Sequence, residues 1–214
     1  MEGPRAPVLT VDNLLQAADN ALRALFAPAR AKRTPQGLPD PCPLEEVDRR
    51  HVAGLMRVNH AGEIAAQALY HGQAFMARGA QTRDFLLQAA AEEGDHLAWC
   101  EQRLTELGER TSLLNPLWYA GSFAIGAAAA AFSDRLSLGF VAETERQVEG
   151  HLAEHLVRLP SADLRSRRIL EAMQRDETGH ADAALSRGAV ELPQLVRKGM
   201  GMTSKLMTRV AYWI

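Results

Sequence analysis

The stretch Ala90-Ala91-Glu92-Glu93-Gly94-Asp95-His96 decides how this chain is interpreted, because its pattern recurs as Gln174-Arg175-Asp176-Glu177-Thr178-Gly179-His180. Both copies read acid, Glu, two further residues and His. Residues three apart lie on the same face of an α-helix, so Glu93 and His96 can direct a carboxylate and an imidazole at one point. A single Glu-x-x-His is better explained as a surface ion pair. Two copies on helical patterns favour a shared site.

Two more acids complete the pattern, with Glu63 placed 30 residues before Glu93 and Glu145 placed 32 residues before Glu177. The order is therefore Glu followed by Glu-x-x-His, repeated once. Ferritin-like four-helix bundles hold two iron or manganese ions with one Glu from each of two helices and one Glu-x-x-His from each of the other two. We therefore predict a metal centre whose ligands are Glu63, Glu93, His96, Glu145, Glu177 and His180.

The charges of this set are compatible with an apolar core. Four carboxylates balance two divalent ions, whereas four unpaired acids would be costly to bury. Three further side chains are predicted to support the ligands from outside: Glu92 and Asp176, each preceding a ligand Glu, and His151. Glu and His suit both iron and manganese, so the ligand types leave the metal open.

Composition limits the alternatives. The chain has 214 residues, 47% of them hydrophobic, which is enough for one full core, and its formal net charge of −2 gives no reason to expect nucleic acid as a partner. Cys42 and Cys100 form neither a CxxC pair nor a disulfide framework. Residues 1–7 do not form a signal-peptide pattern. Alanine and leucine dominate, and β-branched runs are few, so the predicted class is all-α.

Local signals divide the chain into two parts. Thr10 is predicted to cap a helix over residues 12–26, and five prolines between residues 28 and 43 mark an irregular linker. Residues 1–43 are thus an N-terminal helix and Pro-rich linker, and residues 44–214 are the metal-binding domain. Within that domain we expect helices over 47–77, 82–107, from Asn115-Pro116 to 132, 134–159, around the second motif, and over 193–213. Gly62 is expected to allow a neighbouring helix to approach closely.

Two segments suggest additional helices at a membrane interface. Residues 117–132 are apolar almost throughout but fall short of the roughly 20 residues that span a bilayer, so a buried or half-inserted helix is expected. The terminal helix mixes Arg197, Lys198, Lys205 and Arg209 with aromatic and aliphatic residues, as interfacial helices do. A core helix and a solvated basic face are the respective alternatives.

The segment Arg57-Val58-Asn59-His60-Ala61-Gly62-Glu63, followed by Gln67-Ala68-Leu69-Tyr70-His71-Gly72-Gln73, closely resembles the Coq7 family of demethoxyubiquinone hydroxylases. The stretch 138–147 (LGFVAETERQ) and the ending 203–208 (TSKLMT) are also similar to that family. The likeness covers the chain from Leu44 onward. It implies that Glu93 and Glu177 bridge two iron ions, with Glu63 and Glu145 as terminal ligands.

The resemblance further implies an O2-dependent monooxygenase of ubiquinone biosynthesis that hydroxylates the ring of a polyprenyl benzoquinol. Electrons would come from an external reductant, with NADH as the family's candidate, because no dinucleotide-binding fingerprint follows a strand. The implied location is peripheral, on the cytoplasmic face of a bacterial inner membrane. Other ubiquinone-biosynthesis proteins and a second copy of the chain are implied as partners. A ferritin- or rubrerythrin-like iron-storage or peroxide-reducing protein is the main alternative, and a non-catalytic scaffold is another.

Overall fold

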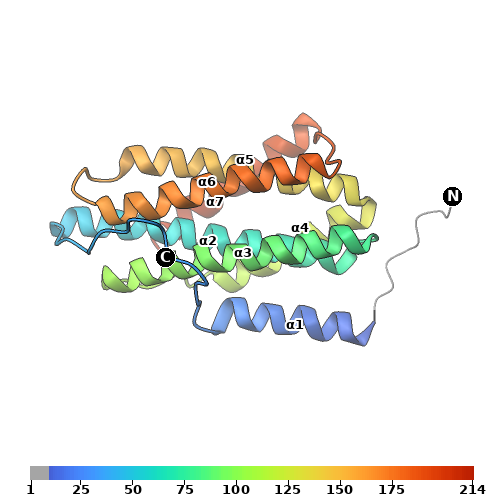
Figure 1. Cartoon of the computed structure of the whole chain (residues 1–214), viewed down its shortest axis with the longest axis horizontal. Coiled ribbons are helices and arrows are strands. Elements are labelled where there is room, and N and C mark those ends of the chain that lie inside the picture. The colour runs from blue at the N-terminus through green and yellow to red at the C-terminus, as the bar shows by residue number, and fades with distance from the viewer. Residues whose placement is uncertain (1–9) are drawn as a thin grey trace.

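The computed structural model describes residues 10–214, and the connections between its helices are irregular (Figure 1). The described chain contains no strand, which confirms the all-α prediction, and the expectation about residues 1–7 lies outside the described part. The helices are α1 Val11–Phe26, α2 Glu46–Met76, α3 Ala80–Glu106, α4 Asn115–Phe132, α5 Asp134–Arg158, α6 Leu164–Ser186 and α7 Gln194–Ala211.

Capping residues mark several of the helix ends. The hydroxyl of Thr10 accepts from the amide of Asn13 at 3.2 Å, and that of Ser133 accepts from Leu136 at 3.1 Å. Gly108, with φ of 69°, follows the end of α3. The start of α4 differs from expectation, because Leu114 occupies the cap position. Asn115 is instead the first residue of α4, and its side-chain nitrogen lies 3.4 Å from Nδ1 of His60.

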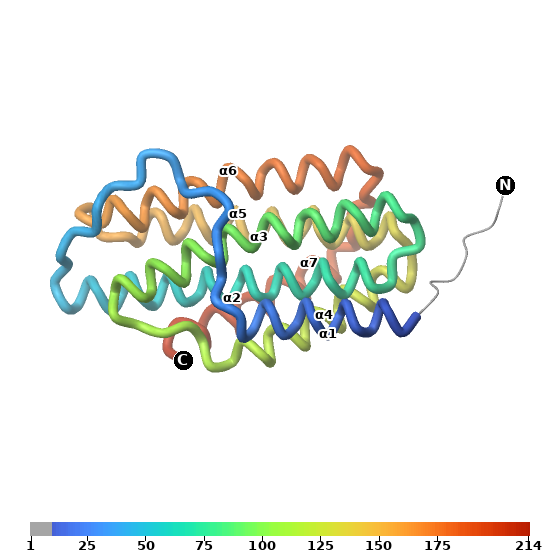
Figure 2. Tube along the Cα trace, turned by 60° about the horizontal axis from the view of Figure 1, so that its bottom comes forward, coloured from blue at the N-terminus to red at the C-terminus, as the bar shows by residue number. Residues whose placement is uncertain are grey.

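Helices α2, α3, α5 and α6 form the four-helix bundle, in which α2 packs against α3 and α5 against α6 (Figure 2). One buried apolar cluster includes Met56, Leu104 and Met173, and another includes Tyr70 and Ala142. Along each of the four helices, the predicted ligands fall between the residues that supply these two clusters. The bundle therefore presents a polar layer between two apolar layers, whose burial supplies most of the stability.

Helix α4 packs closely along α2, and two glycines make this possible. A Cβ atom at Gly72 would overlap the backbone carbonyl of Phe123, and one at Gly126 would overlap that of Leu69. The expectation that Gly62 serves this purpose is wrong, since an added Cβ there would meet no atom within 4 Å. Close contact between the two helices depends instead on Gly72 of α2 and Gly126 of α4.

The remaining segments cover the bundle from outside. α1 packs on α2 and α4 through apolar side chains such as Leu25, and α7 packs on α2 and α5. Both helices leave large apolar side chains exposed, including Phe26 at 71% on α1 and Leu195 at 82% on α7. Within residues 10–214, no helix is both long and apolar enough to span a bilayer, as expected for residues 117–132. Membrane contact stays a prediction.

Candidate metal centre

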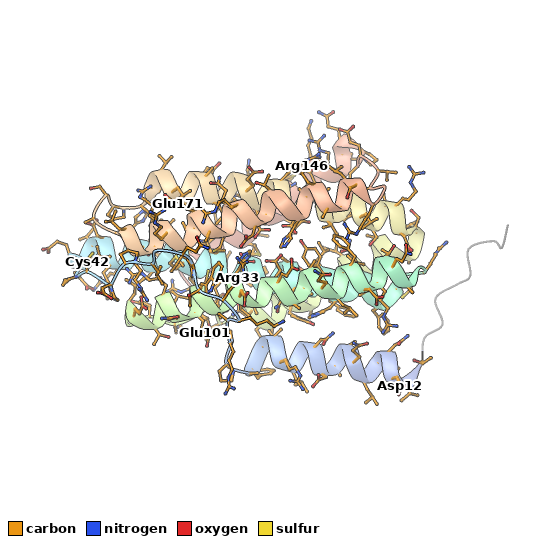
Figure 3. All side chains as sticks on the ribbon, viewed as in Figure 1. Asp12, Arg33, Cys42, Glu101, Arg146 and Glu171 are labelled. Carbon is orange, nitrogen blue, oxygen red and sulfur yellow. The ribbon has the colours of Figure 1, made fainter. Side chains whose placement is uncertain are left out.

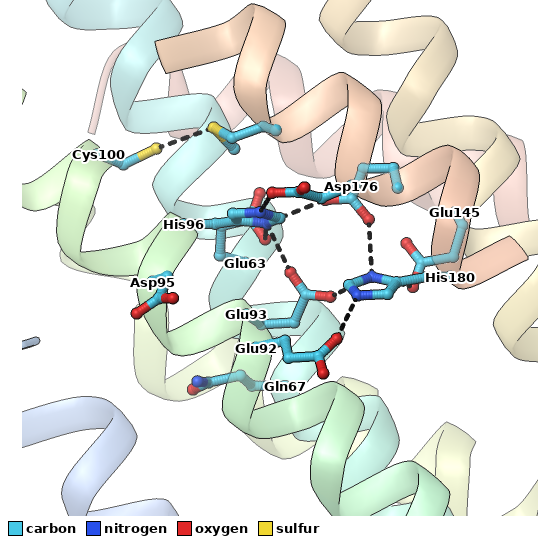
Figure 4. A network of polar contacts seen from close by, with 12 residues as sticks. Glu63, Gln67, Glu92, Glu93, Asp95, His96, Cys100, Glu145, Asp176 and His180 are labelled. Carbon is cyan, nitrogen blue, oxygen red and sulfur yellow. Dashed lines mark hydrogen bonds and ion pairs between the residues drawn. The ribbon is translucent and has the colours of Figure 1, made fainter. Parts of the chain in front are cut away.

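The six predicted ligands meet in the middle of the bundle (Figure 4). Glu63 comes from α2, Glu145 from α5, and the two Glu-x-x-His pairs from α3 and α6. All six are buried, with Glu93 and His96 fully inaccessible. Their donor atoms form two overlapping groups within 4.8 Å: Glu63, Glu93, His96 and Glu177 in one, and Glu93, Glu145, Glu177 and His180 in the other. Each group could hold a metal ion, and Glu93 and Glu177 belong to both.

Both imidazoles point the same nitrogen at the acids. Nδ1 of His96 lies 2.9 Å from Glu93 and 3.1 Å from Glu177. Nδ1 of His180 lies 3.2 Å from Glu93 and 3.5 Å from Glu177. The i, i+3 spacing on each helix produces this arrangement, because it stacks the Glu and His of a motif on one face. Nδ1 is therefore the nitrogen available to a metal at both positions.

The opposite nitrogens, Nε2, contact the acids that precede the motif glutamates. Nε2 of His96 lies 2.9 Å from Asp176, and Nε2 of His180 lies 2.8 Å from Glu92. Each helix thus supplies the outer carboxylate for the histidine of the other helix. Such a carboxylate fixes the tautomer and orientation of a metal-binding imidazole. His151, the third predicted supporting residue, lies elsewhere, with Nε2 at 2.8 Å from the hydroxyl of Ser204 on α7.

Several buried donor and acceptor atoms of the cluster lack a hydrogen bond within the described chain: Oε1 of Glu93, Oε2 of Glu145, both carboxylate oxygens of Glu177 and Nδ1 of His180. Buried polar atoms are rarely left unsatisfied, and such atoms point to a bound ion or water. Five unsatisfied ligand atoms converging on one point match what one or two divalent cations would complete. The donor set therefore fits a metal centre of the carboxylate-histidine type.

Without a cation, the cluster balances its charge by holding protons. Burial raises the pKa of Glu63 and of Glu145 well above the ordinary range, and the neighbouring carboxylates of Glu93 and Glu177 raise it further. Burial lowers the pKa of His180, but the nearby carboxylates of Glu177 and Glu93 outweigh this effect and raise it to about 12. The metal-free site is therefore protonated at neutral pH, and a metal would have to displace these protons.

Two neighbours of the cluster carried no clear signal in the sequence. Tyr70 is fully buried and donates its hydroxyl to Oε1 of Glu145. Arg33 comes from the linker, and its Nη2 donates to Oδ2 of Asp176 at 2.5 Å. The two residues lie 143 positions apart, so no local periodicity could have predicted this contact.

An apolar cavity of about 600 Å³ opens beside the cluster between α2, α4, α5 and α7. Its walls are mainly aliphatic and aromatic, with Leu69, Trp118, Ile125 and Phe140 among them. Glu63 is the one residue of the six that lines it. A smaller, polar cavity of about 380 Å³ lies on the α3 and α6 side, against Glu92, Asp176 and His180. The cluster is thus approached from an apolar side and a polar side.

A bundle with a buried Glu and Glu-x-x-His set from each half is the arrangement of ferritin-like proteins whose carboxylates and histidines can hold two metal ions. Comparison with known proteins is more specific. Residues 50–211 match the family described as "Ubiquinone biosynthesis protein COQ7", and the chain belongs to this family.

Curated relatives match over nearly their full lengths. A protein of Azoarcus sp. (strain BH72) is 56% identical over 196 residues, which cover 91% of this chain and 95% of the relative. One from Nitrosomonas europaea is 52% identical over 209 residues, or 97% of this chain and 100% of the relative. One from Acinetobacter baylyi is 54% identical over 205 residues, or 95% and 97%. All three are named "3-demethoxyubiquinol 3-hydroxylase".

Proposed function

We propose that this chain is a 3-demethoxyubiquinol 3-hydroxylase whose two iron ions are held by Glu63, Glu93, His96, Glu145, Glu177 and His180. The observation that carries the proposal is the apolar cavity ending on Glu63 of a buried cluster of four carboxylates and two imidazoles. The two ligand groups share Glu93 and Glu177, which supports these two as bridges. Names of relatives more than 50% identical support the same reaction.

In the proposed reaction, a ring C–H of the quinol becomes C–OH with one atom of O2, and the other atom leaves as water. Two electrons and two protons complete the balance, and an external reductant supplies the electrons, with NADH as the candidate. The iron pair, when bound, would activate O2 for this insertion. The protein's part is to exclude water, hold the ligands and place the ring.

The lining of the cavity supports one placement for each part of the substrate. The ring would lie at the end lined by Asn59, Glu63 and Thr144, where polar groups can bond the quinol hydroxyls. The isoprenoid tail would run between α4 and α7, past Ile125 and Met207. Tyr70 keeps its proton, because burial and the Glu145 carboxylate raise its pKa well above the ordinary value. It therefore acts as a donor that fixes Glu145.

A peripheral membrane location fits this route for the tail. Leu117, Leu195, Met202 and Leu206 are more than half exposed on α4 and α7, next to the cavity walls. A bacterial inner membrane that carries the quinol would bury these side chains and admit the tail without a passage through water. The same exposed surface is available to a second copy of the chain or to other proteins of ubiquinone biosynthesis.

The test is mass spectrometry of a short-tailed demethoxyquinol after incubation with anaerobically iron-loaded protein, NADH and then air. We expect a gain of one oxygen atom that is lost in Glu93→Gln. Glu154→Gln, at an exposed position of α5, is the matched control and should retain it. Iron that is bound and oxidised without product, under both NADH and a chemical reductant, would refute the proposal. Accumulation of ferric mineral would instead indicate iron storage.

A further inference from the structure

The linker before the bundle contacts the metal centre through Arg33. Figure 3 shows Arg33 about midway along the bundle, where the linker crosses its surface. The guanidinium donates to Asp176 on α6 through Nη2 at 2.5 Å and to Asp95 on α3 through Nε at 3.2 Å. Asp176 is the acid that faces Nε2 of His96 at 2.9 Å. A chain of contacts therefore runs from the linker through Asp176 to His96.

Arg33 is itself held in place from three directions. The backbone amide of Lys32 donates to the other oxygen of Asp95 at 2.6 Å, and the indole of Trp99 donates to the carbonyl of Arg33 at 2.8 Å. The guanidinium also lies 5.0 Å from the centre of the Trp99 ring. Asp95 is buried, so its charge needs these partners. The contacts fix the fork of Arg33 in one orientation.

The second half of the site has no equivalent of Arg33 in the described chain. Nε2 of His180 faces Glu92, whose other oxygen accepts from the neutral amide of Gln88 at 2.9 Å. The Glu92 side chain is 44% exposed, against 26% for that of Asp176. The carboxylate next to His96 is thus ion-paired with an arginine, whereas the carboxylate next to His180 is more exposed and accepts from a neutral amide. The two metal positions have equivalent ligands, but the carboxylates that contact their histidines have different partners.

We propose that Arg33 is a positioning residue that makes the two metal positions unequal, by orienting Asp176 and hence His96. The inference rests on metal binding by the six residues as proposed above. Removal of partners of this kind typically lowers metal affinity by about 10 to 100-fold. Here that loss falls on the position of His96, while the position of His180 keeps its affinity. The linker is then part of the metal centre, although it precedes residues 50–211, which match the family.

The experiment is anaerobic calorimetric titration of the metal-free, full-length protein with Fe²⁺. We expect two binding events in the wild type, and in Arg33→Ala one event weakened by about tenfold or more with the other unchanged. Arg30→Ala removes an exposed cation from the same linker and should match the wild type. Mössbauer spectra of ⁵⁷Fe²⁺-loaded protein should show one of two ferrous signals altered by Arg33→Ala.

Combination with ligand variants identifies the affected position. Arg33→Ala should weaken the remaining event in a His180→Ala background and have no effect in a His96→Ala background. Arg33→Lys keeps the positive charge but removes the planar set of N–H donors of the guanidinium. It replaces the alanine variant if that variant does not fold, and we expect a smaller loss of metal affinity at the same position. Equal weakening of both events, or affinities equal to those of Arg30→Ala, would overturn the inference. Wild-type protein that binds no Fe²⁺ would overturn the proposed function itself.

Discussion

Replacement of Glu145 by Gln should stabilise the metal-free protein while it abolishes tight metal binding. Glu145 is 1% exposed, and burial together with Glu177 and Glu93 raises its pKa well above the ordinary value. The folded, metal-free protein therefore holds this side chain as the neutral acid. Glutamine has nearly the same shape, and its carbonyl oxygen can still accept the hydroxyl of Tyr70.

The magnitude follows from the proton that folding must bind. An unfolded glutamate has a pKa of about 4.3, so protonating it at pH 7 costs up to about 4 kcal/mol at about 1.4 kcal/mol per pH unit. Glutamine avoids this cost. The sign is that of a raised carboxyl pKa: the wild type is relatively most stable below pH 4.3 and loses stability as pH rises. The advantage of Glu145→Gln should therefore be near zero at about pH 4.3 and grow as the pH rises, up to the limit of about 4 kcal/mol at pH 7.

Thermal unfolding by circular dichroism, in the presence of a chelator, measures this difference. About 2 kcal/mol corresponds to a rise in Tm of about 4 to 8 °C for a domain of this size. Glu154→Gln, exposed on the same helix, should leave Tm unchanged. With Fe²⁺ added, the order should reverse, because bound metal stabilises only the protein that retains its ligand. A metal-free Glu145→Gln that is less stable than the wild type at pH 7 would show that the carboxylate is charged and structural, and would refute the reasoning.

Three further predictions concern protons and packing. Metal binding should release protons, since the raised pKa values of Glu63 and His180 keep both side chains protonated in the metal-free site. Calorimetry in buffers of different ionisation enthalpy measures this release, and a metal affinity that does not rise with pH would contradict the prediction. Gly126→Ala should lower the free energy of unfolding, measured with urea, by about 1 to 3 kcal/mol, because the added Cβ overlaps the carbonyl of Leu69. Gly121→Ala, in open space on the same helix, should not lower it, and equal stabilities of the two variants would contradict the prediction. Burial lowers the pKa of His155 to about 3, so His155→Gln should reduce the loss of stability below pH 6.5 by about 1.4 kcal/mol per pH unit, and an unchanged slope would contradict it.

The helices and the gathering of the six acids and histidines were predictable from the sequence because each depends on local spacing. The 3.6-residue period places Glu93 with His96 and Glu177 with His180, and hydrophobic cores can only bury such residues as a group. Helix starts at Thr10 and Ser133 followed from single capping residues. That the six bind iron remains a proposal, and so do the membrane contact and the division at residue 43.

The features that escaped prediction depend on contacts between distant segments. Arg33 reaches Asp176 across an irregular linker, which has no period from which its path could be inferred. No sequence pattern distinguishes Gly72 and Gly126 from Gly62, because only the packing of α2 against α4 decides which glycine meets a neighbouring backbone. The prediction that His151 supports the ligands rests on its residue type alone. Its position on α5 instead directs the imidazole toward Ser204 on α7.

Helix α2 separates the cluster from the apolar cavity, and this arrangement assigns a particular position to Glu63. Gly62, Ala65 and Leu69 line the cavity, whereas Tyr70, one residue after Leu69, faces Glu145 on the cluster side. Glu63 touches both, since it belongs to a ligand group and to the cavity wall. A ring that enters the cavity therefore meets Glu63 before any other of the six residues. Because Gly72 and Gly126 fix α4 against α2, the same close packing that shapes the cavity also sets how near a substrate comes to that carboxylate.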